Sequence, residues 1–87
     1  MSYKLDFSKQ AFKDIQFHKK AGNKTVSKKL ILLLNEITET PFNGTGKPEQ
    51  LKHKLAGCWS RRINGEHRLV YEVEENIVKI HSAKGHY

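Results

Sequence analysis

The sequence predicts a single α+β domain over residues 1–87, with the element order β-α-α-β-β-β. A chain of 87 residues has the length of one domain. Apolar side chains recur at helical spacing in two adjacent segments of the first half, and short alternating segments separated by turn residues fill the second half. This pattern favours a helical hairpin packed on one face of a mainly antiparallel, four-stranded sheet.

A short strand and two helices are expected in the first half of the chain. Tyr3 to Phe7 alternate in polarity, and Ser8 can cap a first helix that ends at Gly22-Asn23. A second helix begins near Thr25 and ends at Pro41, which cannot continue a helix. The apolar positions are Phe12, Ile15 and Ala21 in the first helix and Val26, Leu30, Leu33 and Ile37 in the second.

Three strands are expected in the second half, after an ordered loop from Pro41 to Gln50. They cover residues 59–63, 67–73 and 77–82, and turn residues separate them at 64–65 and 74–76. The helices would cover one face of this sheet, and little apolar material is left to cover the other. An open face that carries arginines is where a ligand would lie.

The loop after residues 59–63 decides which arginines share that face. A two-residue loop at Asn64-Gly65 would pair Arg61 with Arg68. A loop with an odd number of residues would pair Arg62 with Arg68 instead, because a slip of one residue turns every side chain to the other face.

The charge of the chain favours a polyanionic partner. Sixteen Lys and Arg against nine Asp and Glu give a formal net charge of +7, which suits RNA, DNA, an acidic protein or a membrane surface. The longest apolar run, Leu30 to Leu34, is too short to span a membrane, and the N-terminus lacks the apolar segment of a signal peptide. The expected location is the cytoplasm.

The cysteine and histidine content predicts no metal site. Cys58, the single cysteine, cannot form an internal disulfide or half of a paired-cysteine zinc site, and is expected to be a small buried hydrophobe. Of the five histidines only His81 and His86 are closely spaced, and no carboxylate or thiol lies near them along the chain. Hydrogen-bonded or solvated histidines are therefore expected, and no metal or other cofactor.

The segment from Lys47 to Tyr71 combines basic, acidic and aromatic side chains. RNA can be cleaved without a metal when a base removes the 2′-OH proton, a cation stabilises the phosphorane, and an acid protonates the leaving 5′ oxygen. Glu, Arg and His can supply these roles, and the segment contains all three. A solvated basic face with one core tryptophan is the alternative interpretation.

Several motifs fall in or near this segment: Gly46-Lys47-Pro48-Glu49, Leu51-Lys52-His53, Gly57-Cys58-Trp59-Ser60-Arg61-Arg62-Ile63 and Glu66-His67-Arg68-Leu69-Val70-Tyr71. Thr40-Pro41-Phe42 precedes them and His86-Tyr87 ends the chain. Together they resemble the YoeB toxins, which belong to the RelE-like group of bacterial toxin–antitoxin systems. The resemblance spans nearly the whole chain and is densest between Thr40 and Tyr71.

The resemblance implies an mRNA interferase, an endoribonuclease that cuts message held in the ribosomal A site and so arrests translation. The catalytic residues that it implies are Glu49 as general base, Arg68 as stabiliser of the phosphorane, His86 as general acid, and Tyr87 as the group that orients the RNA or the acid. The residues that it implies for binding phosphate or RNA are Lys47, Lys52, Arg61 and Arg62.

The resemblance also implies partners. These are the ribosome with its mRNA and a cognate antitoxin, similar to YefM, whose C-terminal segment covers the active site. No membrane partner is expected, and whether the protein is a homodimer is left open. The family groups Arg62 with Arg68, which favours the odd loop or a bulge.

The C-terminal tail carries a further expectation. Ala83-Lys84-Gly85 would turn the chain so that His86 faces Arg68 and Glu49. Lys84-Gly85 stand where the family often has an arginine and a large residue, so Gly85 is expected to loosen the tail and affect the level of activity.

Two other functions stay open. One is a non-enzymatic RNA- or DNA-binding module, which would explain the charge but not a carboxylate at Glu49 among cations. The other is a toxin fold that has lost catalysis and acts as an RNA-binding or antitoxin-binding module.

Overall fold

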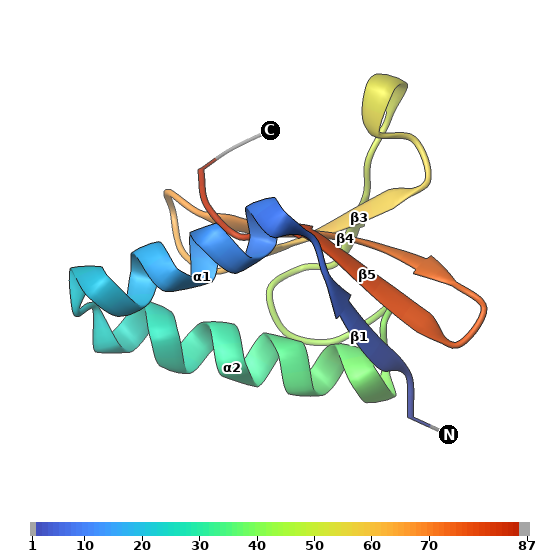
Figure 1. Cartoon of the computed structure of the whole chain (residues 1–87). Coiled ribbons are helices and arrows are strands. Elements are labelled where there is room, and N and C mark those ends of the chain that lie inside the picture. Colours follow the sequence, from blue (N-terminus) through green and yellow to red (C-terminus); the bar gives the residue numbers. More distant parts are fainter. Residues whose placement is uncertain (1, 86–87) are drawn as a thin grey trace.

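A five-stranded sheet carries two helices on one face (Figure 1) in the computed structural model, which describes residues 2–85. The strand order in the sheet is β1-β5-β4-β3-β2. The elements are β1 (Lys4–Phe7), α1 (Lys9–Ala21), α2 (Lys24–Glu39), β2 (Glu49–Gln50), the 3₁₀ helix η1 (His53–Leu55), β3 (Cys58–Arg62), β4 (Arg68–Glu74) and β5 (Ile77–Ser82).

The α+β architecture with a helical hairpin on one face is confirmed, but the expected number of four strands is wrong. The additional strand, β2, pairs Glu49 with Ser60 and Gln50 with Trp59 inside the segment expected to be a loop. Two residues are too few to show an alternating pattern. At the opposite edge β1 runs parallel to β5, whereas the other pairs are antiparallel, so the sheet is mixed.

The ends of both helices follow from local capping, as expected. The Ser8 hydroxyl accepts a hydrogen bond from the Ala11 amide at the start of α1. Gly22 ends α1 with φ of 70°, a left-handed conformation that favours glycine. Asn23 then caps α2 by accepting a hydrogen bond from the Val26 amide.

The two helices differ in how well their buried faces were predicted. In α2 the four expected positions, Val26, Leu30, Leu33 and Ile37, are all buried. In α1 only Ile15 of the expected positions packs against the core. Phe12 is 60% exposed and Ala21 is exposed, and the buried residues are Ala11, Asp14 and His18. This helix buries two polar side chains because both form hydrogen bonds with the backbone of Ala83.

The main core lies between the helices and the sheet. Side chains of α2 pack there against fully buried residues of the central strands, namely Leu69, Tyr71, Val78 and Ile80. Side chains alternate along a strand, so Val70, between Leu69 and Tyr71, points to the opposite face. There it forms a second, small cluster with Leu51 and Cys58, and the expectation that Cys58 is buried is confirmed.

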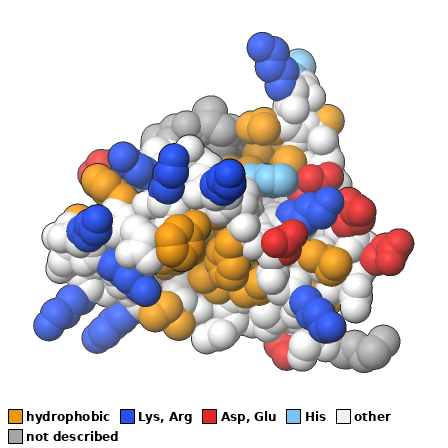
Figure 2. Space-filling view, in the orientation of Figure 1, with side chains coloured by type: hydrophobic (Ala, Val, Ile, Leu, Met, Phe, Trp, Pro, Cys, Tyr) orange, Lys and Arg blue, Asp and Glu red, His pale blue; other side chains and the backbone are white. Residues whose placement is uncertain are grey.

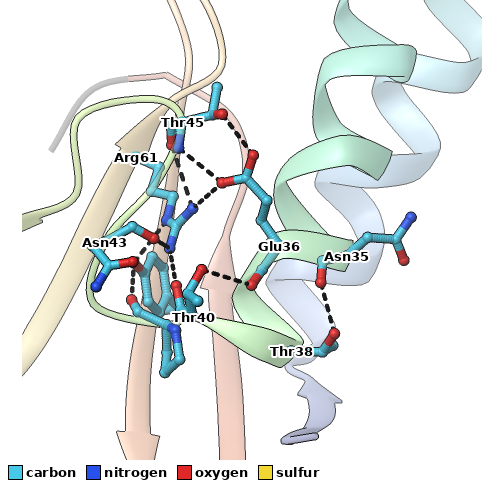
Figure 3. A network of polar contacts seen from close by, with 9 residues as sticks. Asn35, Glu36, Thr38, Thr40, Asn43, Thr45 and Arg61 are labelled. Carbon is cyan, nitrogen blue, oxygen red and sulfur yellow. Dashed lines mark hydrogen bonds and ion pairs between the residues drawn. The ribbon is translucent and has the colours of Figure 1, made fainter.

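Arg61 is fully buried between the sheet and the loop that follows α2 (Figure 3). Its Nε donates to the Tyr71 hydroxyl at 3.0 Å, and its Nη1 donates to Glu36 Oε1 at 3.0 Å. Its Nη2 donates to the backbone oxygens of Thr40 and Asn43 at 2.6 and 2.8 Å. One guanidinium therefore ties α2, the loop and two strands together.

The partners of Arg61 are themselves satisfied. The Tyr71 hydroxyl donates to the Pro41 oxygen at 2.7 Å, and burial raises the pKa of Tyr71. Hydrogen bonds from the hydroxyl and amide of Thr45, followed by the nearby Arg61 charge, lower the pKa of Glu36. The expectation that Arg61 binds RNA phosphate is therefore wrong, since this side chain has no exposed surface and is surrounded by protein acceptors.

Replacing Arg61 by methionine should lower the free energy of unfolding by about 3 kcal/mol or more, because Glu36 and several buried acceptors lose their donor. Urea denaturation measures this loss. Arg62→Met is the matched control, since Arg62 is the exposed neighbour on the same strand; we expect a change within about 0.5 kcal/mol. Equal losses in the two variants would contradict the structural role of Arg61.

Candidate functional site

The register of β3 and β4 brings Arg62 and Arg68 opposite each other. The connection, residues 63–67, holds an odd number of residues, and its turn is closed by Asn64, whose side-chain oxygen accepts from the amides of Glu66 and His67. The prediction of an odd loop that pairs Arg62 with Arg68 is confirmed. Both arginines lie on the face away from the helices, because their strand neighbours Arg61 and Leu69 are buried on the helix side.

Glu49 lies on the same face in the adjacent row. It pairs with Ser60 across β2 and β3, and Ser60 is two residues from Arg62 on β3. Residues two apart on a strand share a face and are about 7 Å apart. A carboxylate and two guanidinium groups thus occupy neighbouring rows, with Glu49 and Arg62 exposed and Arg68 half-buried.

The loop before β2 passes directly beside Arg62. The Arg62 amide donates to the Gly46 oxygen at 2.7 Å. Gly46 has φ of 86°, and a Cβ there would lie 2.9 Å from the Arg62 oxygen, so only glycine fits. Lys47 follows Gly46 in the chain and is exposed. Lys52 is also exposed, and it lines an open groove together with Glu49.

The C-terminal segment returns to Arg68. The Arg68 amide donates to the Gly85 oxygen at 3.1 Å, and the Gly85 amide donates to Nδ1 of His67 at 2.9 Å. Both backbone groups of Gly85 are thus bonded, and its φ of 73° suits glycine. The expectation that Gly85 loosens the hold on His86 stays a prediction. The expected catalytic residues His86 and Tyr87 lie outside the described residues.

Comparison with known proteins identifies the family of the chain. Residues 7–87 match the family model described as a YoeB-like toxin of bacterial type II toxin-antitoxin systems. Toxin YoeB of Escherichia coli K12 is 43% identical over 84 residues, covering 97% of this chain and 99% of that protein. The chain belongs to the YoeB toxin family.

Solved structures give the same result for the fold. The YoeB-YefM complex from Staphylococcus aureus contains a chain that is 46% identical, with a TM-score of 0.86 and full coverage of both chains. The YoeB dimer from the same organism is 45% identical with a TM-score of 0.87, again over both full chains. The architecture described above is thus that of YoeB toxins. Within residues 2–85 neither helix combines the length and the apolar content needed to cross a membrane.

In this YoeB-family chain α1 holds the segment that leads to the C-terminus. Asp14 accepts a hydrogen bond from the Ala83 amide at 2.9 Å, and Gln10 donates to the other oxygen of Asp14. His18 Nε2 lies 2.7 Å from the Ala83 oxygen and must donate to it, because a carbonyl only accepts. The His18 ring also packs edge-on against His67, with centroids 4.7 Å apart.

We call Asp14, His18 and His67 the tail clamp. These three residues fix both backbone groups of Ala83 and the amide of Gly85, and so deliver the chain to Arg68. None of them was singled out from the sequence as a functional residue. The available signal was weak: Asp14 and His18 share a helical face with Ala11, but the partner that makes this polar face buried lies 65 or more residues away.

Replacing Asp14 by alanine should release the Ala83 amide. Loss of a buried hydrogen bond costs about 1–3 kcal/mol, so amide hydrogen exchange at Ala83 should accelerate by about 5- to 150-fold if local opening controls it. Asp6→Ala removes an exposed carboxylate from β1 and is the control, with no change expected at Ala83. Equal exchange at Ala83 in the wild type and in Asp14→Ala would contradict the clamp.

Proposed function

We propose that this YoeB-family toxin is a ribosome-dependent, metal-independent endoribonuclease that cleaves mRNA in the ribosomal A site and thereby inhibits translation. The observation that carries the proposal is the open face of the sheet. Glu49, Arg62 and Arg68 lie there in neighbouring rows, and Gly85 brings the end of the described chain to Arg68. The residue types match those needed for cleavage by the 2′-hydroxyl.

The proposed reaction is an internal transfer at phosphorus. Glu49 accepts the 2′-OH proton, and the 2′ oxygen forms a bond to the adjacent phosphorus. The bond from phosphorus to the 5′ oxygen breaks, and His86 donates a proton to that oxygen, leaving a cyclic phosphate and a 5′-hydroxyl end. Arg68 neutralises the charge of the phosphorane, and Tyr87 orients the RNA or the acid. The roles of His86 and Tyr87 rest on the family resemblance.

Arg62 and Lys52 are proposed to bind the RNA phosphates or ribosomal RNA, with Lys47 beside them. Arg62 is exposed on the same face of the sheet as Glu49, and Lys52 lines the same groove as Glu49, which supports this role. Arg61 has no part in it, because it is buried in the loop network. Guanidinium groups suit this task, since their planar donors match two phosphate oxygens at once.

The environment of Glu49 favours an enzyme over a binding module. A carboxylate repels phosphate, so a module that only binds RNA gains nothing from one among its cations. A structural ion pair with Lys52 would be the simplest other explanation. Within residues 2–85 Glu49 is in no salt bridge with Lys52 or any other cation, so its charge remains available for proton transfer.

We further propose that the cellular partner is a cognate antitoxin of the YefM type. Two structures from Staphylococcus aureus support this proposal: a YoeB-YefM complex and a heterotetrameric YoeB-YefM complex, whose matching chains are 46% and 45% identical to this chain. An acidic, otherwise disordered C-terminal segment would fold over the open face and exclude RNA from Arg62 and Arg68. A homodimer is proposed by the same analogy with the YoeB dimer.

The helical side offers a second surface for these partners. Figure 2 shows Lys and Arg gathered near the α1–α2 turn, Asp and Glu near the β4–β5 turn, and apolar side chains between them. The large apolar side chains exposed on the helices are Phe12, Phe17, Ile31 and Leu32. Contact with such side chains would give the antitoxin or a second copy an apolar share of the binding energy.

Purified protein added to a translating ribosome system tests the proposed activity. We expect new 5′-hydroxyl ends on the message. Primer extension locates these ends, and direct labelling by a polynucleotide kinase shows that they carry a free hydroxyl. Glu49→Gln and a chain that ends at Gly85 should each cleave at least ~10²-fold more slowly, because each lacks one proton-transfer group. Glu75→Gln, an exposed carboxylate in the β4–β5 turn, should cleave as the wild type does.

Three results of this experiment would count against the proposal in different ways. Ribosome binding without new ends would favour the inactive module. Cleavage by the shortened chain at close to the full rate would remove His86 and Tyr87 from the mechanism. Cleavage by Glu49→Gln at close to the full rate would remove Glu49 as the base.

The affinity for the antitoxin should fall as salt rises, because the chain carries +7 and exposed charge pairs are screened beyond about 8 Å at physiological ionic strength. Calorimetric titration with the cognate antitoxin over a series of NaCl concentrations measures the dependence. The apolar contacts should leave substantial affinity at high salt. An affinity that does not change with salt would show that the cationic face plays no part in the complex.

A further inference from the structure

Three metal-binding side chains meet on the open face of the sheet, outside the candidate active site. Atoms of Cys58, Glu72 and His81 that could ligate a metal all lie within 4.8 Å of one another. They come from β3, β4 and β5, three neighbouring strands. The premise that His81 has no thiol or carboxylate near it is therefore wrong in space, although it holds along the chain.

The strand register explains why these three residues meet. Cys58 pairs directly with Glu72 across β3 and β4. On β5 Ile80 pairs with Tyr71 and Ser82 with Val70, so His81 is the residue that the bulge inserts. Bulges re-aim side chains, and here Nε2 of His81 lies 3.0 Å from Oε1 of Glu72. All three residues thus lie on paired strands of the sheet, so the cluster does not depend on the ordering of a loop.

The spacing fits a tetrahedral zinc ion. Zinc bonds of about 2.0–2.3 Å to nitrogen, oxygen and sulfur place neighbouring ligand atoms about 3.5 Å apart. The histidine and the carboxylate are already closer than that, and the sulfur is within 4.8 Å of both. Small side-chain rotations would complete the site, and Glu72 and His81 are each 39% exposed, so an ion can reach it from solvent.

The electrostatics leave room for a cation. The Glu72 carboxylate lies directly across from the Cys58 thiol. Lys79 pairs with Glu72 in the register, but its ammonium group binds Glu74 at 2.9 Å. A divalent metal would neutralise a thiolate and a carboxylate together.

We propose that Cys58, Glu72 and His81 form a binding site for one zinc ion, with a fourth position open to solvent. Three protein ligands and one open position are common for zinc. The ion would link three strands at a point four residues along β3 from Arg62, about 13 Å away. Glu49, which pairs with Ser60, lies in the row between Cys58 and Arg62. None of the three proposed ligands belongs to the proposed cleavage site, so the metal proposal does not rest on that site.

Cobalt(II) is the sharpest probe of this site, because it replaces zinc and absorbs light. A thiolate bound to cobalt gives a charge-transfer band in the near ultraviolet. The chain has one cysteine, so such a band can arise only from Cys58. We expect metal-free protein to develop the band at one cobalt per chain, and one equivalent of zinc to remove it.

Variants then assign the other ligands. Cys58→Ser should abolish the band, and Glu72→Gln and His81→Gln should each weaken zinc binding at least about tenfold, because even outer-shell partners of a metal contribute that much. His53→Gln and Glu75→Gln change an exposed histidine and an exposed carboxylate elsewhere, and should bind as the wild type does. Circular dichroism confirms that each variant is folded.

A second measurement protects the test against poor folding of the Cys58 variant. Zinc should raise the melting temperature of the wild type but not of His81→Gln, whose altered side chain is partly exposed. The absence of a thiolate band, or zinc binding by folded Cys58→Ser or His81→Gln at close to wild-type affinity, would overturn the proposal.

Discussion

The buried guanidinium of Arg61 determines the path of the loop on which half of the candidate site depends. Its hydrogen bonds reach α2, β4 and the backbone of residues 40–45. The loop that it holds then places Gly46 against Arg62 and leads into β2, which carries Glu49. A charge in this position is stable only because every donor faces an acceptor. One of the three arginines of the chain is thus a structural residue.

The other half of the candidate site depends on α1. This helix uses its buried polar side chains, rather than apolar ones, to hold Ala83, and His67 then takes the Gly85 amide. Buried polar groups destabilise a fold when they are unpaired, so the segment from Ala83 to Gly85 is held in the conformation that forms these hydrogen bonds. The loop before β2 and the segment after β5 both end at the Arg62–Arg68 pair.

The open face of the sheet therefore carries two groups of polar residues, which lie toward opposite ends of β3 and β4. Near the 63–67 connection lie the arginines with Glu49, and farther along the strands lie Cys58, Glu72 and His81. The first group is rich in cations and suits a polyanion. The second combines a thiol, a carboxylate and an imidazole and suits a metal. Side chains alternate between the two faces along a strand, so every second residue of three strands lies on this face. The same face can therefore carry both groups.

The sequence by itself determined the features that depend on near neighbours in the chain. Ser8, Gly22 and Asn23 end and start helices through bonds to residues within a few positions, and the stripe on α2 follows from helical spacing. The motifs between Thr40 and Tyr71 were also sufficient to identify the family. These features could be predicted because their physical causes are local.

Only the tertiary structure decided the features that depend on distant partners. Arg61 and Arg62 are identical in type and adjacent, and the parity of one loop turned the first into the core and the second to the open face. The parallel pairing of β1, the burial of Asp14 and the meeting of Cys58 with His81 join residues 23 to 73 positions apart. No local pattern contains such pairings, because they are set by which strands and helices pack together.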